Sequence, residues 1–157
     1  MVPQLKKNKK FRSKFEANVC EHLTKKLVPY KYETIKIHYI IPESNHTYTP
    51  DVLLENGIII EIKGRFVKED RKKHLLIKQQ LPHLDIRFIL QNSKSKLYKG
   101  SKTTYAQWLS KNNFLWAEKY VPIEWINEKQ QNNIQDTHKI HSGFIGRRSI
   151  NSKGRRK

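Results

Sequence analysis

Hydrophobic and polar positions recur with two different periods along the chain, and these periods predict its helices and strands. A hydrophobic residue at every fourth position predicts one face of a helix over residues 13–27. Alternation over residues 30–41 predicts a half-buried strand. The polar segment that follows is bracketed by Pro42 and Pro50, and we expect it to be extended because the residue before a proline disfavours helix.

The second half of the chain continues this succession of helices and strands. A helix is predicted over residues 68–82, with Leu75, Leu76 and Ile77 on its apolar side. A short buried strand is predicted at residues 85–90 and a short helix at residues 103–111. Two apolar clusters follow within residues 118–126. Because about four strands alternate with three or four helices, the pattern predicts one α/β domain built on a mixed sheet. It leaves open whether helices cover one face of that sheet or both.

The segment TPDVLLENGIIIEIKGR, residues 49–65, predicts a β-hairpin with an Asn-Gly pair in its turn. A two-residue loop would place Asp51 opposite Ile62, whereas a three-residue loop ending at Gly57 would place Asp51 opposite Glu61. The three-residue loop needs a left-handed residue at its last position, and glycine adopts that conformation without strain. We therefore predict the three-residue loop and the pairing of Asp51 with Glu61.

In that register the hairpin has one apolar face, and Asp51, Glu61 and Lys63 lie on the other. The apolar face consists of Val52, Leu54, Ile58, Ile60 and Ile62. Two opposed carboxylates should repel each other unless a cation lies between them. The alternative is an ordinary solvent-exposed face.

The spacing Pro50-Asp51, then Glu61-x-Lys63, is the PD...(D/E)xK signature of a large superfamily of metal-dependent nucleases. Carboxylate oxygens suit Mg²⁺, which binds phosphate oxygens and activates a water. A nearby ammonium can orient that water or offset charge on phosphorus. Together with the hairpin register, this signature favours a catalytic role for the charged face.

The charge distribution indicates a polyanionic partner. The formal net charge is +18 over 157 residues, with six bases and no acid in residues 1–14 and seven bases and no acid in residues 137–157. Basic ends of this kind typically bind nucleic acid, and a ribosomal or packaging-type protein is the alternative on charge alone. We expect a basic arm at residues 1–12, a nuclease domain at residues 13–127 and a basic tail, disordered until it meets a partner, at residues 128–157.

The remaining composition favours a reducing, soluble compartment. Cys20 is the single cysteine, so no intrachain disulfide can form. No apolar run approaches the roughly 20 residues that span a membrane, and the basic start has no apolar stretch after it, as a secretory signal would. We expect a soluble protein that is not secreted and has no membrane partner.

Five segments of the chain resemble the endonuclease I family of the short-tailed T-odd coliphages, which are Holliday-junction resolvases. The similarity runs in register from about Phe11 to Ile126, through FRSKFEANV, IPESNHTYTPDVLLENGIIIEIKG, DRKKHLLIKQQLPHLDIRFIL, KLYKGSKTTYAQW and VPIEWI. The motif SNHTYTPD followed by DRKKHLLI is far more specific than the nuclease signature itself. Residues beyond Asn127 are not part of the resemblance.

The resemblance implies a restriction-endonuclease-like α/β fold, with a mixed sheet flanked by helices, in a strand-exchanged (domain-swapped) homodimer. Residues 13–40 would be exchanged with the partner chain through a bridge near residues 41–50. The implied catalytic residues are Glu16, Asp51, Glu61 and Lys63, with Asp51, Glu61 and the partner chain's Glu16 as metal ligands. From the residues alone, Glu16 fits a capping box with Ser13 at the start of a helix. Whether Glu16 serves as a helix cap, as a metal ligand or as both is left open.

The implied activity is a structure-selective DNA endonuclease that resolves four-way and other branched junctions by paired symmetric nicks. It would use Mg²⁺, or Mn²⁺ in its place, with two ions per active site and no small-molecule cofactor. It would act in the cytoplasm of the bacterial host, in phage recombination, branch removal before packaging and host DNA breakdown.

Junction selection must rest on shape and phosphate contacts rather than on a base code. The candidate DNA-binding residues are Arg65, Arg71, Lys72, Lys73, Lys94, Lys96, Lys99 and His46. Each of them could equally be an ordinary surface residue. Two other functions stay open, a sequence-specific nuclease of restriction type and a non-enzymatic basic DNA-binding protein.

Overall fold

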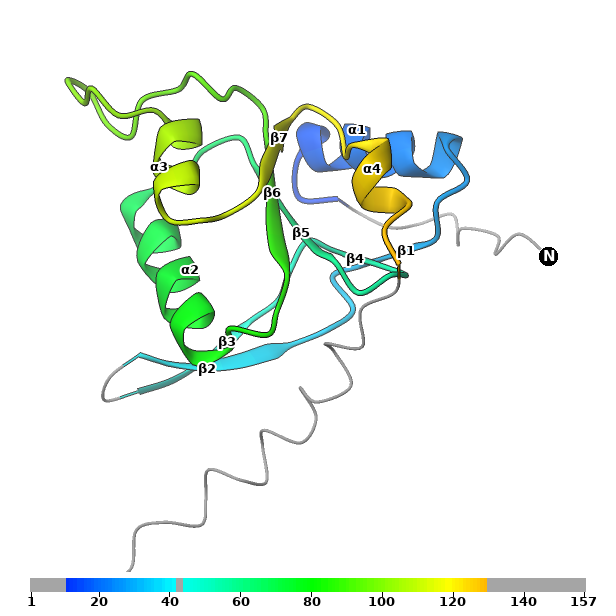
Figure 1. The fold of residues 1–157 in the computed structure, drawn as a ribbon, viewed down its shortest axis with the longest axis horizontal. Coiled ribbons are helices and arrows are strands. Elements are labelled where there is room, and N and C mark those ends of the chain that lie inside the picture. The colour runs from blue at the N-terminus through cyan, green and yellow to red at the C-terminus, as the bar shows by residue number, and fades with distance from the viewer. Residues whose placement is uncertain (1–10, 42–43, 130–157) are drawn as a thin grey trace, which may run out of the picture.

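A five-stranded mixed sheet runs through the middle of the protein, with helices on both of its faces (Figure 1). The structure is a computed structural model that describes residues 11–41 and 44–129. Along these residues the elements are α1 (Lys14–Lys25), β1 (Tyr30–Tyr32), β2 (Ile37–Ile41), β3 (Ser44–Tyr48), β4 (Val52–Leu54), β5 (Ile59–Lys63), α2 (Lys68–Gln80), β6 (Ile86–Leu90), α3 (Tyr105–Lys111), β7 (Trp116–Glu118) and α4 (Ile123–Ile126).

The strand order of the main sheet is β1-β4-β5-β6-β7, and β2 and β3 form a separate two-stranded sheet. Strands β1, β4 and β5 pair antiparallel, whereas β5, β6 and β7 pair parallel. The parallel pairs need crossover connections, which α2 and α3 supply. The predicted α/β class and mixed sheet are therefore confirmed.

Two apolar clusters hold the layers together, one on each face of the sheet. On one face α2, α3 and the β2–β3 hairpin pack against the sheet through residues such as Ile77, Leu109 and Phe88. On the other face α1 and α4 pack against the apolar side of β4 and β5, where Leu23 contacts the cluster that contains Ile60. Burial of this apolar area drives the assembly of the layers. The sequence pattern left open whether helices cover one face of the sheet or both. In the structure they cover both, so the domain has three layers.

The ends of the helices follow local sequence signals. Ser13 accepts a hydrogen bond from the backbone N–H of Glu16 and caps α1. Thr104 and Gln107 form a reciprocal capping box at the start of α3. Helix α2 ends at Leu81, directly before Pro82. The three predicted helices at residues 13–27, 68–82 and 103–111 therefore exist, with ends within about two residues of the predicted ones.

One predicted strand is two strands in the structure. The alternation over residues 30–41 predicts one strand, but β1 and β2 belong to different sheets, and the chain turns at Glu33, whose φ is +47°. Tyr32 and Ile37 are both buried. They are an odd number of residues apart, so a single strand would point them to opposite faces. The turn at Glu33 carries the chain from the main sheet to the two-stranded sheet, so that Tyr32 lies in the cluster with α1 and Ile37 in the cluster with α2. This division of one predicted strand into two also raises the strand number above the predicted four.

Helix α2 buries a more polar face than predicted. Leu75, assigned to its apolar side, is exposed, whereas Arg71 and His74 are buried with Ile77. These three buried residues recur at every third position, which is one face of a helix. The helical period therefore predicts the buried face of α2 better than the local run of three apolar residues does.

Two predicted segments fall mostly outside the described residues, the basic arm at residues 1–12 and the tail at residues 128–157. The first residue of that tail, Glu128, binds the guanidinium of buried Arg87 with distances of 2.6 and 2.7 Å. Among the described residues, no helix is long and apolar enough to cross a membrane.

Candidate active site

The hairpin of β4 and β5 has the three-residue loop that the sequence predicts. Val52 pairs with Ile60 and Leu53 with Ile59, a register that places residue 51 opposite residue 61. The N–H of Leu54 donates to the carbonyl of Ile58 at 2.9 Å, which closes the loop. Gly57 has a φ of +91°, so glycine supplies the left-handed conformation at the last loop position. The register prediction is confirmed.

The two faces of the hairpin also divide as predicted. All five residues of the predicted apolar face lie in the cluster shared with α1. Glu61 and Lys63 lie on the opposite face, toward α2 and β3. The Asp51 side chain does not turn fully to that face, because its Oδ2 accepts a hydrogen bond from the backbone N–H of Ile62 at 2.7 Å. It therefore sits directly before the first residue of β4, in line with the sheet.

Glu61 is held by three side chains in a buried position. Its Oε1 lies 2.8 Å from Nζ of Lys63 and 3.4 Å from Nε2 of His74. Its Oε2 accepts a hydrogen bond from the Tyr48 hydroxyl at 2.5 Å. Lys63 also lies 3.6 Å from Asp70. The acid and the lysine of the nuclease signature are thus a buried ion pair rather than exposed neighbours, and the alternative of a solvent face does not hold.

The electrostatics keep this pair charged. Burial by itself would raise the pKa of Glu61, but His74 and Lys63 hold that pKa well below its usual range. Burial lowers the pKa of His74 itself, so its imidazole is neutral and we attribute the ionised Glu61 chiefly to Lys63. Burial would lower the pKa of Lys63, yet Glu61 and Asp70 raise it above its usual value. Lys63 is consequently an ammonium, able to orient a water or stabilise negative charge.

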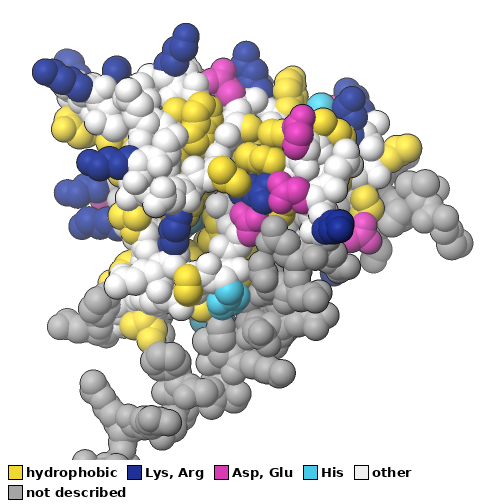
Figure 2. Space-filling view, viewed as in Figure 1, with side chains coloured by type: hydrophobic (Ala, Val, Ile, Leu, Met, Phe, Trp, Pro, Cys, Tyr) yellow, Lys and Arg dark blue, Asp and Glu magenta, His cyan; other side chains and the backbone are white. Residues whose placement is uncertain are grey.

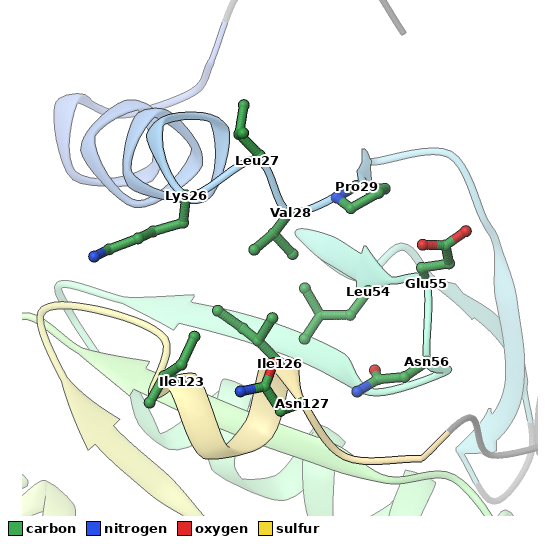
Figure 3. Close-up of a pocket in the computed structure, with 10 residues that line it drawn as sticks. All are labelled: Lys26, Leu27, Val28, Pro29, Leu54, Glu55, Asn56, Ile123, Ile126 and Asn127. Atoms are coloured by element: carbon green, nitrogen blue, oxygen red, sulfur yellow. The ribbon is translucent and has the colours of Figure 1, made fainter. Parts of the chain in front are cut away.

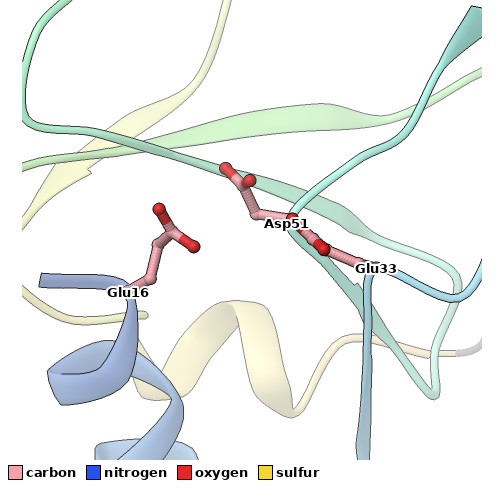
Figure 4. A group of neighbouring side chains, drawn as sticks. All are labelled: Glu16, Glu33 and Asp51. Carbon is pink, nitrogen blue, oxygen red and sulfur yellow. The ribbon is translucent and has the colours of Figure 1, made fainter. Parts of the chain in front are cut away.

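A second group of acids lies beside the Glu61–Lys63 pair, at the start of β4. Carboxylate oxygens of Glu16, Glu33 and Asp51 lie within 4.8 Å of one another. Figure 4 shows the Glu16 side chain pointing from the first turn of α1 toward Asp51. These acids come from an α1 residue, the turn after β1 and the start of β4, three segments far apart in the sequence.

Glu16 serves as part of a helix cap and as part of this acid group. Ser13 Oγ accepts from the Glu16 N–H at 3.1 Å and donates to its carboxylate at 3.0 Å. The Tyr32 hydroxyl donates to the other carboxylate oxygen. The structure therefore supports the role of Glu16 in the helix cap, and it places the Glu16 carboxylate near Asp51 within a single chain, whereas its role as a metal ligand stays a prediction.

Glu33 is an acid of this group that the sequence pattern did not single out. Its backbone N–H donates to the Asp51 carbonyl at 3.0 Å, and its carboxylate pairs with Nε of Arg12 at 2.7 Å. Its left-handed φ of +47° is uncommon for a residue with a side chain. This conformation turns the chain where β1 ends, and so brings Glu33 next to Asp51.

The negative charge of the neighbouring acids contributes to a raised pKa of Asp51. Burial and the charge of Glu61 raise this pKa from its ordinary value of 3.8 to about 7, against the lowering effect of the Ile62 N–H and Lys63. A carboxylate in this state gains much from a nearby cation. Three oxygen donors around it fit a hard divalent ion such as Mg²⁺ or Mn²⁺. Glu61 lies outside this group and in its observed rotamer is turned toward Lys63.

The functional side chains missing from the sequence prediction are Glu33, Tyr48 and His74. Tyr48 and His74 are fully buried, and their rings meet edge to face at 5.3 Å. Neither ring nitrogen of His74 makes a hydrogen bond of good geometry among the described residues, but Nε2 lies 3.4 Å from Glu61 Oε1, and the charges of Lys63 and Lys73 are also near the ring. The signal that could have found them is the buried acid itself, since a buried carboxylate requires polar partners.

The candidate DNA-binding residues divide into exposed and internally bound side chains. Six of the candidates are exposed: Arg65, Lys72, Lys94, Lys96, Lys99 and His46. Two of these also have a partner within the chain, because Lys96 Nζ donates to the Lys102 carbonyl at 3.0 Å and His46 Nε2 lies 2.8 Å from Ser44 Oγ. Lys73 is partly buried, with its ammonium 4.9 Å from the centroid of the Tyr48 ring. Arg71 is buried and its Nη1 donates to the Phe66 carbonyl at 2.6 Å, so its guanidinium supports the fold rather than offering a free surface charge to DNA.

A cavity lined by both apolar and polar side chains lies away from this chemistry, between the end of α1, the hairpin loop and α4 (Figure 3). It has a volume of about 480 Å³, and Val28, Leu54 and Ile126 point into it. The carboxylates of the acid group do not line it. We therefore assign the candidate active site to the start of β4 and the end of β5, which lie side by side, and not to this cavity.

Comparison with known proteins agrees with the resemblance found in the sequence. A family model described as phage endonuclease I matches residues 2–143. The chain is 50% identical over 121 residues to endonuclease I of Escherichia phage T7, covering 77% of this chain and 81% of that protein. It is 47% identical over 133 residues to endodeoxyribonuclease 1 of Enterobacteria phage T3, covering 85% of this chain and 88% of that protein. The chain belongs to the phage endonuclease I family.

Proposed function

We propose that this protein is a metal-dependent DNA endonuclease that resolves four-way and other branched DNA junctions. Its relatives are named as an endonuclease and an endodeoxyribonuclease, which supports DNA cleavage as the reaction. The observation that carries the proposal is the buried Glu61–Lys63 pair opposite Asp51, next to the acids of α1 and the β1 turn. Non-enzymatic DNA binding would give no reason to bury these charges at such cost.

The side chains suit hydrolysis of a phosphodiester. Mg²⁺ bound by Asp51 and Glu16, with Glu61 as a further ligand, would supply positive charge to the phosphate and lower the pKa of the attacking water. Lys63, held charged by Glu61, can orient that water and stabilise the charge that develops on the phosphate oxygens. Tyr48 and His74 keep Glu61 in place beside Lys63. Mn²⁺ should substitute, and the number of ions we propose is two per site.

A strand-exchanged homodimer is part of the proposal. Exchange replaces contacts within a chain by the same contacts between chains. The Glu16–Asp51 proximity seen in one chain would then be formed by Glu16 of one chain and Asp51 of the other, with the crossing near residues 41–50. Two sites related by a two-fold axis would give paired nicks in two strands of a junction. We propose that this takes place in the cytoplasm of the bacterial host, in phage DNA recombination.

The most informative test is Lys63→Ala assayed beside wild type on a four-way junction with Mg²⁺. We expect a variant that binds the junction and does not cut it. Normal cleavage by the variant would refute the proposed active site, and the non-enzymatic alternative predicts that Lys63 is dispensable. Linear duplexes with the same sequences serve as the control, because preferential cleavage of one linear site would favour a restriction-type nuclease.

Mixed dimers test the shared active site. One chain carries Glu16→Ala and the other carries Asp51→Ala. If Glu16 acts on the opposite chain, one site has both defects and the other has neither, so the mixed dimer nicks one strand. If Glu16 acts within its own chain, both sites are defective and the mixed dimer does not nick.

A further inference from the structure

The loop between β6 and α3, residues 91–104, lies at the same edge of the sheet as the candidate active site. It leaves β6 directly after Leu90, and Leu90 pairs with Lys63 in the parallel register. The carboxyl ends of parallel strands meet at one edge, so the loop starts beside the catalytic lysine. Figure 1 shows this loop projecting from the body of the protein beyond α3.

The loop is held in one conformation at its base and at its tip. At the base, the N–H of Gln91 donates to the Lys63 carbonyl at 3.0 Å, and the N–H of Ser93 donates to Glu118 at 2.9 Å. Toward the tip, Leu97 and Ser101 make backbone hydrogen bonds that close the turn. These hydrogen bonds define the backbone path of the loop, from which its side chains project.

Tyr98 projects from the turn of this loop among lysines. It is 66% exposed, unlike the aromatic side chains of the core. Four lysines of the loop are exposed around it in sequence, Lys94, Lys96, Lys99 and Lys102. Figure 2 shows Lys and Arg side chains at the upper left of this face, where Figure 1 places the loop. An exposed aromatic ring within a rigid basic loop matches the physical requirement for stacking on a nucleic-acid base, because lysines attract the backbone while the ring offers a face.

We propose that Tyr98 stacks on an unpaired or unstacked base of the DNA substrate, while the lysines of its loop contact the flanking phosphates. This inference rests on the proposed function, since it names how DNA cut at the Asp51–Lys63 site is recognised. It also gives a reason for branch selectivity without a base code. A fully stacked duplex offers no base face to Tyr98, whereas bases at a branch point can open.

Binding assays in EDTA test the proposal without cleavage. The probes are a single-stranded oligonucleotide, a duplex with one unpaired base and the fully paired duplex, each with the full-length chain. Tyr98→Ala should weaken binding to the first two about ten- to a hundred-fold. It should change binding to the paired duplex less than about two-fold, and Tyr98→Phe, which keeps the ring, should bind like wild type.

Two matched variants separate stacking from other causes. Leu115→Ala removes an exposed apolar side chain of 55% exposure directly before β7, at the opposite edge of the sheet, and should change nothing. Lys99→Ala should weaken binding to all three probes alike and reduce the salt dependence. The proposal is overturned if Tyr98→Ala binds all probes like wild type or loses affinity equally on all. The nuclease proposal is refuted by normal cleavage in Lys63→Ala, whereas this proposal is judged by binding of the Tyr98 variants in EDTA, so the failure of one is distinguishable from the failure of the other.

Discussion

Replacing Asp51 with asparagine should stabilise the metal-free protein and abolish its activity. The carboxylate of Asp51 is partly buried beside other acids, so its ionised form opposes folding unless a cation is present. Asparagine has nearly the same shape and keeps an oxygen that can accept the hydrogen bond from the Ile62 N–H. The substitution therefore removes the charge while leaving the local contacts in place.

The size and the sign of the effect follow from the pKa of Asp51. Folding raises that pKa from its ordinary value of 3.8 to about 7, which corresponds to about 4 kcal/mol at about 1.4 kcal/mol per pH unit. The folded state binds more protons than the unfolded state between these two pH values, so this carboxyl destabilises the wild type increasingly as pH rises toward 7. Above pH 7 we expect Asp51→Asn to be more stable by up to about 4 kcal/mol. The difference should shrink as pH falls and vanish near pH 4.

Denaturation by urea in EDTA at pH 8.5, 7.0 and 5.5 measures this difference. Glu55→Gln is the matched control, because it removes one negative charge from an exposed position of the same hairpin loop. Mg²⁺ added at pH 8.5 should stabilise the wild type and not Asp51→Asn. An Asp51→Asn chain that is no more stable than the wild type at pH 8.5 would refute the reasoning. A gain in stability that does not depend on pH would refute it as well.

Substitutions at Tyr48, Gly57 and Ser13 test how the site is supported. Tyr48→Phe removes the hydroxyl that holds Glu61, and should lower junction cleavage about 10- to 100-fold and change the Mg²⁺ dependence while leaving junction binding in EDTA unchanged; equal loss of binding would contradict a positioning role. Gly57→Ala forces a side chain into a φ of +91°, and should lower the free energy of unfolding by about 1–2 kcal/mol in urea, whereas Gly57→Asn should recover part of the loss. Ser13→Ala and Thr104→Ala each remove a helix cap and should each cost about 1 kcal/mol, but only Ser13→Ala should also lower cleavage, as measured on a four-way junction.

The register of the hairpin could be predicted because few possibilities had to be distinguished. Side chains alternate between two faces of a strand, so a loop of two or three residues decides at once which residues oppose Asp51. Gly57 favoured one loop, and the apolar run favoured the same register. Local sequence information was therefore sufficient for the placement of Glu61 and Lys63.

The partners of these residues could not be predicted in the same way, because they come from distant segments. Tyr48 reaches Glu61 from β3, and His74 reaches it from α2. No period within β5 indicates which side chains of another layer will cover it. Glu33 was missed for a related reason, since its place next to Asp51 depends on a left-handed turn that the alternation over residues 30–41 conceals.

The position of the acids relative to the layers explains why one site depends on the whole fold. Glu61 lies on the α2 side of the sheet, and Glu16 comes from α1 on the other side. Asp51 lies between them, directly before β4. A cation that binds both Asp51 and Glu16 therefore joins α1 to the sheet edge. If α1 is exchanged between two chains, the same cation joins the two chains, and Mg²⁺ should then stabilise the dimer as well as the chain. Glu16→Gln should reduce that metal-dependent stabilisation, as measured by the dissociation of the dimer on dilution with and without Mg²⁺, and a dimer equally stable in both conditions would argue against a ligand shared between chains.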